Sequence, residues 1–180
     1  LKILKKEALV KLEVIEEKIY EKAGYRFDVG SSQQLAKVLF ADKGLGMKAN
    51  GTNKYTTKGK NKHWSTNKEV LKAMERAALN AETPPAVRKE LEIVTDIQAF
   101  RTISTRLNTF IRPLLERCHT SNIIHPRFLQ IGTVSGRFSS RDPNYQNLPR
   151  KGGIRKAFVA RKGYVIVKAD YSQAELRLLA

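Results

Sequence analysis

The feature that most constrains the fold is a stretch of about 30 residues with apolar side chains at helical spacing. These side chains are Val87, Leu91, Val94, Ile97, Phe100, Ile103, Leu107, Ile111, Leu114 and Cys118. A helix with one apolar stripe of this length needs a partner along it, because the stripe stabilises the helix only when it is buried. Pro84 and Pro85 should interrupt the preceding chain, and Pro113 should kink the helix or end it early.

A second long helix is predicted at the start of the chain, over residues 1–22. Its apolar residues, also at helical spacing, are Leu1, Leu4, Ala8, Leu12, Ile15 and Ile19. Gly24 supplies a left-handed end, and Ser31 or Ser32 can cap a short helix that closes near Gly44. Two long striped helices joined by short segments suggest an antiparallel pair.

Between the two helices lies a lysine-rich segment, at about residues 43–68, with no acidic residue between Asp42 and Glu69. Its lysines, asparagines and threonines can contact phosphates by charge and by hydrogen bond together, although a solvated flexible loop has the same composition. Trp64 fits either an anchor on the helices or a platform for a base, and we favour the anchor. Thr66 and Glu69 form a capping box that predicts another helix start.

Past residue 120 the pattern becomes strand-like, and we place a domain boundary there. The β-branched run Tyr164–Ala169 predicts a buried strand, with Asp170 where that strand ends and a helix begins. A carboxylate in this position either presents a metal ligand to substrate or caps the following helix.

Charge narrows the class of partner. Lys and Arg number 34 against 17 Asp and Glu, a formal charge of +17 that favours a polyanion. The sequence shows no signal-peptide pattern and no apolar run near the roughly 20 residues that span a bilayer, so we expect no membrane partner. The single cysteine, Cys118, indicates a reducing compartment, and we expect an intracellular protein of the cytoplasm or nucleoid.

Four segments then follow in a fixed order: Ser135–Ser140 (SGRFSS), Asp142–Pro149 (DPNYQNLP), Ile154–Phe158 (IRKAF) and Asp170–Arg177 (DYSQAELR). In order and spacing they resemble the DNA-directed DNA polymerases of family A, and the resemblance extends more weakly through the helices before them. It implies an α+β fold in which residues 1–120 form a helical thumb with a basic DNA-contacting tip. Residues 121–180 would then be a partial palm, with its first strands, that ends at motif A, before the fingers.

The resemblance also assigns roles around the last segment. Asp170 corresponds to one of two aspartates that bind two Mg²⁺ ions, and Tyr171 adds its backbone carbonyl. The incoming deoxynucleoside triphosphate would lie against Ser172, Gln173 and Glu175, with Glu175 excluding a 2′-hydroxyl. Taken alone, Glu175 is better interpreted as an ordinary first-turn glutamate favoured by the helix dipole.

Primer-template DNA is the implied macromolecular partner. Arg137 corresponds to an arginine that reaches the minor groove, whose purine N3 and pyrimidine O2 acceptors are present in every correct pair; a structural ion pair is the alternative for it. The other implied DNA contacts lie in the later loops and in the tip: Asn144, Gln146, Asn147, Lys151, Arg155, Lys54, Lys58, Lys62, Ser65, Thr66 and Asn67.

The sequence departs from the family at Ala174, where isoleucine is usual, and at Ser135, where threonine is commoner. The second catalytic aspartate and the fingers would lie beyond Ala180, so we expect these 180 residues to be a fragment that is inactive alone. A palm sheet without its later strands would also self-associate. The competing interpretation is a non-catalytic basic module that binds nucleic acid, which explains the charge but not the four ordered segments.

Overall fold

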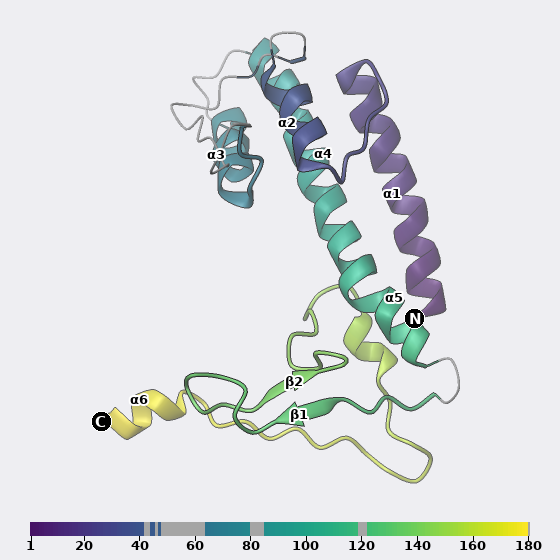
Figure 1. The fold of residues 1–180 in the computed structure, drawn as a ribbon, viewed down its shortest axis with the longest axis vertical. Coiled ribbons are helices and arrows are strands. Elements are labelled where there is room, and N and C mark those ends of the chain that lie inside the picture. Colours follow the sequence, from purple (N-terminus) through teal and green to yellow (C-terminus); the bar gives the residue numbers. More distant parts are fainter. Residues whose placement is uncertain (42–43, 46, 48–63, 80–84, 119–121, 180) are drawn as a thin grey trace.

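The computed structural model describes residues 1–41, 44–45, 47, 64–79, 85–118 and 122–179 (Figure 1). Side chains of residues 77–79 and 85–91 are outside this description, as are most residues of the lysine-rich segment. The described chain is rich in helix and carries one small two-stranded sheet, which agrees with the expected α+β class. None of its helices is both long and apolar enough to cross a membrane.

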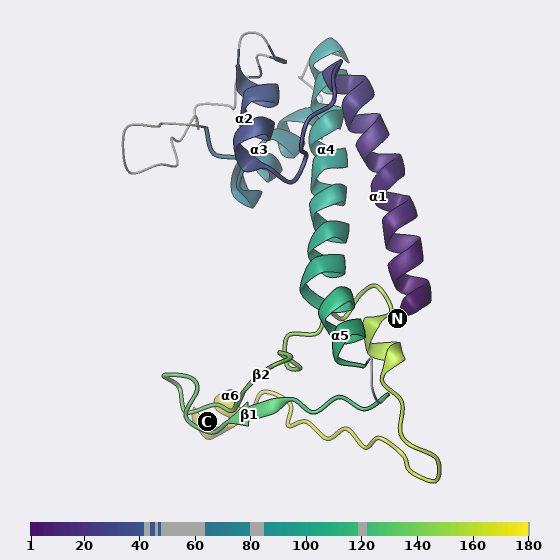
Figure 2. The ribbon, with the colours of Figure 1, turned by 45° about the vertical axis from the view of Figure 1, so that its right-hand side comes forward.

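Two long helices form the upright part of the molecule, and Figures 1 and 2 show them side by side and antiparallel. They are α1 (Lys2–Ala23) and α4 (Pro85–Arg106). The Lys22 ammonium joins them, 2.7 Å from an Asp96 carboxylate oxygen and 3.5 Å from one of Glu92. Gly24 ends α1 in the left-handed conformation, at φ 81°, as its position predicted.

The long helix continues past α4 through a π-helical turn, η1 (Leu107–Ile111), into α5 (Arg112–Arg117). The expected length of about 30 residues is therefore confirmed, and the disturbance lies just before Pro113. Proline has no N–H to donate, and its ring crowds the carbonyl four residues earlier, so a wider turn relieves the contact.

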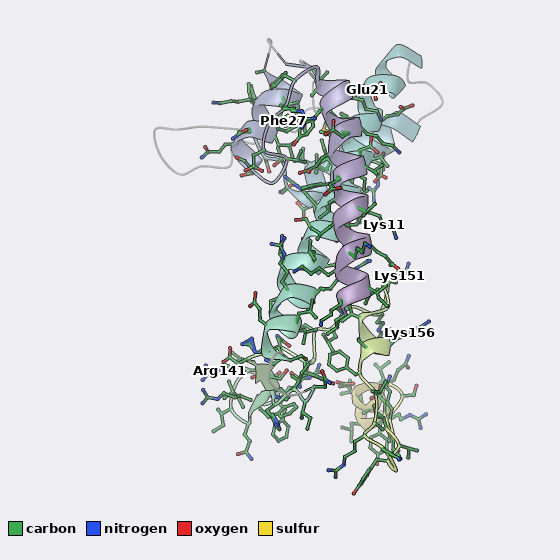
Figure 3. All side chains as sticks on the ribbon, turned by 90° about the vertical axis from the view of Figure 1, so that its right-hand side faces the viewer. Lys11, Glu21, Phe27, Arg141, Lys151 and Lys156 are labelled. Atoms are coloured by element: carbon green, nitrogen blue, oxygen red, sulfur yellow. The ribbon has the colours of Figure 1, made fainter. Side chains whose placement is uncertain are left out.

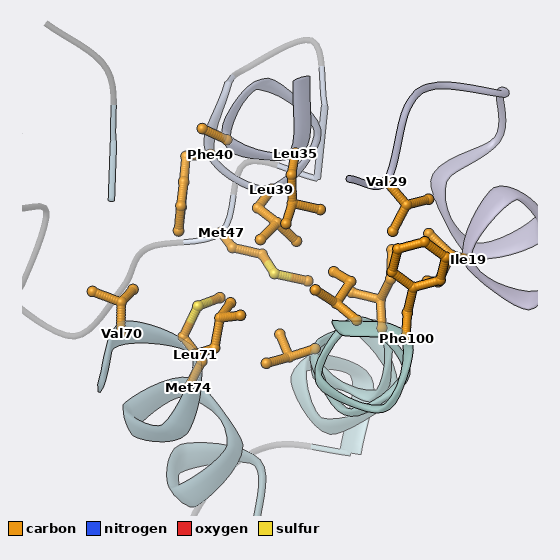
Figure 4. Close-up of a cluster of buried hydrophobic side chains, with 14 residues drawn as sticks. Ile19, Val29, Leu35, Leu39, Phe40, Met47, Val70, Leu71, Met74 and Phe100 are labelled. Atoms are coloured by element: carbon orange, nitrogen blue, oxygen red, sulfur yellow. The ribbon is translucent and has the colours of Figure 1, made fainter. Parts of the chain in front are cut away.

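An upper core forms where α2 (Ser32–Phe40) and α3 (Lys68–Leu79) pack on the long helices (Figure 4). Leu35 and Leu39 of α2 meet Leu71 of α3 and Ile97 of α4 in it, and all four are at most 1% exposed. Ser31 is the N-cap of α2, since its hydroxyl accepts from the Gln34 N–H at 3.4 Å.

Trp64 packs against the same core, with its ring centroid 5.9 Å from that of Phe40. The prediction that it anchors its segment on the helices is confirmed. The predicted capping box of Thr66 and Glu69 is wrong, because α3 begins one residue later than it requires. The Asn67 side-chain oxygen accepts from the Val70 N–H at 2.9 Å and caps the helix instead.

A second, smaller core lies at the base of the long helices. Leu107, Ile111 and Leu114 pack there with Leu148 and with Ile154, which opens the short 3₁₀ helix η2 (Ile154–Ala157). The base core therefore joins the long helices to the later segments of the chain, which form an arm beneath them (Figure 1).

The arm holds the sheet, made of β1 (Arg127–Leu129) and β2 (Ser139–Arg141). The strands are antiparallel, and Phe128 faces Ser140 across them. The predicted buried strand over Tyr164–Ala169 is wrong: these residues are exposed, Val165 and Val167 at 84% each, and belong to no sheet. A β-branched run becomes a strand only when a neighbouring strand pairs with it and a second layer covers it.

Asp170 follows this exposed segment, so it does not stand at a strand end. It does not cap the next helix either, because α6 (Ala174–Leu179) begins four residues later. The strand-end position and the helix cap are therefore wrong, while the role of Asp170 as a metal ligand stays a prediction.

Candidate nucleic-acid interface

The structure brings together two of the four ordered segments on the arm. Arg137 of the first and Glu175 of the last, 38 residues apart, form an ion pair with a guanidinium nitrogen 2.6 Å from a carboxylate oxygen. Both side chains remain about 70% exposed, so the guanidinium is open to another ligand. The ion-pair alternative for Arg137 is thus present without burying the residue.

Ser140, at the junction of the first two segments, is 4% exposed. Its hydroxyl oxygen accepts from the backbone N–H groups of Tyr145 and Gln146, at 2.9 and 3.2 Å. The loop after β2 therefore folds back onto the strand. Sequence reasoning gave Ser140 no role; the signal was a serine two residues before the Asp142-Pro143-Asn144 turn, where a hydroxyl can hold the loop.

The amides expected to contact DNA take part in the same loop. The Gln146 side chain donates to the Phe138 carbonyl at 3.0 Å, and the Asn144 side-chain oxygen accepts from the Asn147 N–H at 3.2 Å. Asn144, Gln146 and Asn147 are nevertheless exposed, so each of these residues stays accessible to a ligand. Their first effect is to fix the loop that carries them.

Arg155 is also engaged within the chain. Its Nε and Nη2 donate to the Leu148 carbonyl at 3.2 and 2.7 Å, which ties η2 to the preceding loop. Lys151 and Lys156 are exposed near the start of α1, on the other side of the arm from Arg141 (Figure 3). α6, which carries Glu175, lies at the far end of the arm in Figure 1, away from the start of α1.

Just after Asp170, Arg177 of α6 holds the backbone by two local hydrogen bonds, one of them from its backbone N–H to the Gln173 carbonyl at 3.1 Å. Arg177 of α6 donates from Nε to the Ser172 carbonyl at 2.9 Å, which braces the turn through Gln173. Asp170, Tyr171, Ser172 and Gln173 are all exposed. The segment from Asp170 to Gln173 is therefore open to solvent.

Comparison with known proteins identifies this arrangement. The sequence model for DNA polymerase family A matches residues 1–180. The thermostable DNA polymerase I of Thermus thermophilus is 37% identical over 185 residues, which cover 100% of this chain and 20% of the relative. The chain belongs to DNA polymerase family A.

Further relatives of the family agree. DNA polymerase I of Chloroflexus aurantiacus is 36% identical over 169 residues, covering 91% of this chain and 16% of the relative. Among solved structures, the POL domain of Pol1 from M. smegmatis, in complex with DNA primer-template and dNTP, superposes with a TM-score of 0.72 at 29% identity. That superposition covers 99% of this chain and 29% of the neighbour. The chain spans about a fifth of the length of these curated relatives.

Family A DNA polymerases are metal-dependent enzymes, so Asp170 and the carboxylates near it are the candidate metal ligands to consider. Within the described ranges, no group of three or more His, Cys, Asp and Glu side chains could hold a metal ion. Glu175, the nearest carboxylate in the sequence, is paired with Arg137. Asp170 and the Tyr171 carbonyl therefore do not make a metal site by themselves.

The tip residues expected to bind DNA in this family A chain separate into two groups. Lys54, Lys58 and Lys62 lie outside the described residues. Ser65 and Thr66 are only 3% and 5% exposed, so direct contact with DNA, as the resemblance implied, is at odds with the structure. The Ser65 hydroxyl instead accepts a hydrogen bond from the Asn67 N–H, and the Asn67 side chain caps α3.

A half-buried arginine holds Thr66, near the C-terminal end of the lysine-rich segment. Arg101 of α4 donates from Nη2 to the Thr66 hydroxyl at 2.9 Å and from Nη1 to the Thr66 carbonyl. Burial lowers the pKa of the Arg101 guanidinium. Sequence reasoning missed Arg101, because nothing in its helical context separates it from a solvated arginine.

We expect Arg101→Met to lower the free energy of unfolding by about 2 kcal/mol, because it leaves the buried Thr66 oxygens without their charged donor. Urea unfolding followed by circular dichroism measures this change. Arg26→Met is the matched control, since Arg26 is 74% exposed, pairs with the exposed Glu17 and lies 5.3 Å from the centroid of the Tyr20 ring; it should change stability by under about 1 kcal/mol. Equal losses in both variants would contradict a structural role for the Arg101 contact.

Proposed function

We propose that the protein is a DNA-directed DNA polymerase, a nucleotidyltransferase of DNA replication or repair, and that these residues bind its primer-template DNA. The observation that carries the proposal is the Arg137–Glu175 pair at 2.6 Å. It places two family segments, proposed to sense the DNA and the nucleotide, in direct contact within a chain that belongs to DNA polymerase family A.

We assign residues 1–120 to the thumb and residues 121–180 to part of the palm. The antiparallel pair of α1 and α4, with the lysine-rich segment following α2, supports the first assignment. The base core and the small sheet support the second, because the chain changes there from long helices to short strands and loops. The similar M. smegmatis domain holds DNA primer-template and dNTP, which supports both ligands for this protein.

For the DNA, we assign the central contact to Arg137. A guanidinium in the minor groove can donate to purine N3 or pyrimidine O2, which every correct base pair offers, so it registers pairing without reading sequence. The exposed amides of Asn144, Gln146 and Asn147 lie on the loop that Ser140 holds, and they can reach the same groove or the sugar-phosphate backbone. Lys151, with the tip lysines Lys54, Lys58 and Lys62, adds contacts to phosphate. Arg155 does so only if it leaves the Leu148 carbonyl.

For the nucleotide, we assign Glu175 to exclude a 2′-hydroxyl, with Ser172 and Gln173 beside the incoming deoxynucleoside triphosphate. Asp170 and the Tyr171 carbonyl are hard oxygen ligands of the kind Mg²⁺ prefers, and we propose Mg²⁺ as the metal of the complete enzyme. Two oxygen groups are too few to hold Mg²⁺, which takes near-octahedral coordination, so further ligands would complete the site.

The test compares binding of a labelled primer-template with a recessed 3′ end against blunt duplex of equal length. We expect the chain to prefer the recessed end, and Arg137→Ala to weaken binding there by about tenfold while leaving blunt duplex unchanged. Fluorescence anisotropy at fixed salt gives both affinities. Arg26→Ala, which removes an equally exposed ion-paired arginine from the other end of the molecule, should alter neither.

The second candidate is a basic module that binds nucleic acid without catalysis, and the charge of +17 favours it equally. The same experiment separates the two. A chain that binds both DNA ends equally, and that loses nothing on Arg137→Ala, would support the module and contradict the polymerase assignment of Arg137.

A further inference from the structure

The outer face of α1 carries apolar side chains that nothing in the described structure covers. Ile3, Val10 and Val14 are 74%, 52% and 52% exposed. They are spaced by seven and four residues, so they line one face of the helix. Ala8 and Ile19, by contrast, are buried and belong to the two cores.

At its N-terminal end this face borders a shallow, open space of about 680 Å³, called the groove below, whose lining residues all belong to α1. The groove is lined by Lys2, Ile3, Lys6, Glu7, Val10 and Lys11. Aliphatic side chains thus lie among three ammonium groups and one carboxylate. A groove with an apolar floor and a predominantly cationic lining suits a ligand with apolar side chains and negative charges around them.

We propose that this groove is a docking site for an acidic protein segment, bound as an amphipathic helix. From Lys2 to Val14 the surface extends for about 18 Å along α1, which matches about three turns of a bound helix. Apolar residues of the segment, at positions i, i+3 or i+4, and i+7, would cover Ile3, Val10 and Val14. Its glutamates or aspartates would meet Lys2, Lys6 and Lys11.

Charge separates this occupant from a second copy of the chain. Two copies meeting through this face would bring Lys2, Lys6 and Lys11 of each against the same lysines of the other, in molecules that each carry a charge of +17. Like charges placed together in this way oppose association.

The composition of the groove also disfavours nucleic acid and membrane as the occupant. DNA gains little from an aliphatic floor, because bases stack on aromatic side chains and the groove lining has none. Membrane-surface helices insert large apolar or aromatic residues, whereas this face offers one isoleucine and two valines, with Glu7 among them.

The surface lies away from the proposed DNA contacts on the sheet and on α6, whereas Lys151 lies near the start of α1. In Figures 1 and 2, α1 lies on one side of α4, while α6 and the sheet lie below and toward the other side. Figure 3 looks onto the α1 side, where Lys11 projects from the helix. The proposal therefore does not rest on the polymerase assignment, and the two fail in different experiments.

The probe is a fluorescein-labelled synthetic peptide long enough to form four helical turns. It has leucines at the helical spacing given above and glutamates at the other positions. We expect saturable binding to the 180-residue chain by anisotropy. The double change Ile3→Gln and Val10→Gln should weaken it by about tenfold, as should Lys6→Glu with Lys11→Glu. All four positions are exposed, so the fold should survive, and circular dichroism checks it.

Matched controls test for general charge attraction. Lys18→Glu lies on α1 outside the groove, and Val159→Gln lies on the arm at 80% exposure; neither should change peptide affinity. A scrambled peptide of the same composition should bind at least about tenfold more weakly, since it keeps the charge but not the apolar face.

Three results would overturn the proposal. One is a peptide affinity that the groove variants leave unchanged. Another is binding of duplex DNA, or of vesicles of phosphatidylcholine with phosphatidylserine, that the Ile3 and Val10 double variant weakens more than it weakens peptide binding. The last is a dimer in sedimentation equilibrium that the same double variant abolishes, which would make the face a contact between copies.

Discussion

Replacing Ile97 by alanine will lower the free energy of unfolding by about 3 kcal/mol. Ile97 is fully buried on α4, in the upper core where α1, α2 and α3 meet the long helix. Truncation removes buried methyl and methylene groups and leaves a cavity that neighbouring elements fill only in part. Urea unfolding, followed by far-ultraviolet circular dichroism, measures the loss from the shift of the midpoint at constant slope.

The chain offers a control with the same chemistry. Ile131 is 96% exposed on the arm, so Ile131→Ala removes the same atoms without opening a cavity. Its effect should stay within about 0.5 kcal/mol. A loss in Ile131→Ala as large as in Ile97→Ala would mean that the upper core is not the centre of stability.

Raising monovalent salt from about 50 to about 200 mM will weaken binding of primer-template DNA by about a hundredfold or more. The reason is counterion release: about four lysine contacts with phosphate, each worth about 0.9 in the slope of log affinity against log salt, give a steep dependence. The proposed contacts are Lys54, Lys58, Lys62 and Lys151. A salt titration by fluorescence anisotropy yields the slope directly.

A single variant tests whether the slope is built from particular lysines. Lys151→Gln should reduce its magnitude by about one, because one phosphate contact is lost. Lys18→Gln, an exposed lysine on α1 that is given no DNA contact, should leave it unchanged. A flat slope, or equal effects of the two variants, would contradict localised phosphate binding.

The helical part of the fold was predictable because its signals are local. Apolar spacing located the α1 and α4 helices, Gly24 marked an end, and Ser31 a beginning. The strand over Tyr164–Ala169 was not, since a strand depends on partners far along the chain that its own composition does not reveal. The apolar side chains of this segment are exposed, and the self-association expected from them stays a prediction that sedimentation would test.

The candidate site was predictable as a set of residues but not as an arrangement. The ordered segments named Arg137 and Glu175, yet only the folded chain shows them joined at 2.6 Å. The buried Thr66 hydroxyl accepts from Arg101 of α4, which lies 35 residues later in the chain. A hydroxyl beside a lysine-rich segment looks available for phosphate until such a long-range partner is known.

The division of the apolar contacts between two cores along one helix bears on how the molecule opens. The upper core draws on α1, α2, α3 and α4, whereas the base core consists of few buried side chains and includes Leu148 and Ile154 from the arm. Cooperativity need not extend across both, since a unit with fewer buried contacts opens at lower free energy. Amide hydrogens of the arm and of η2 should therefore exchange with solvent through a subglobal opening. Those of the upper core should exchange only when the whole molecule unfolds.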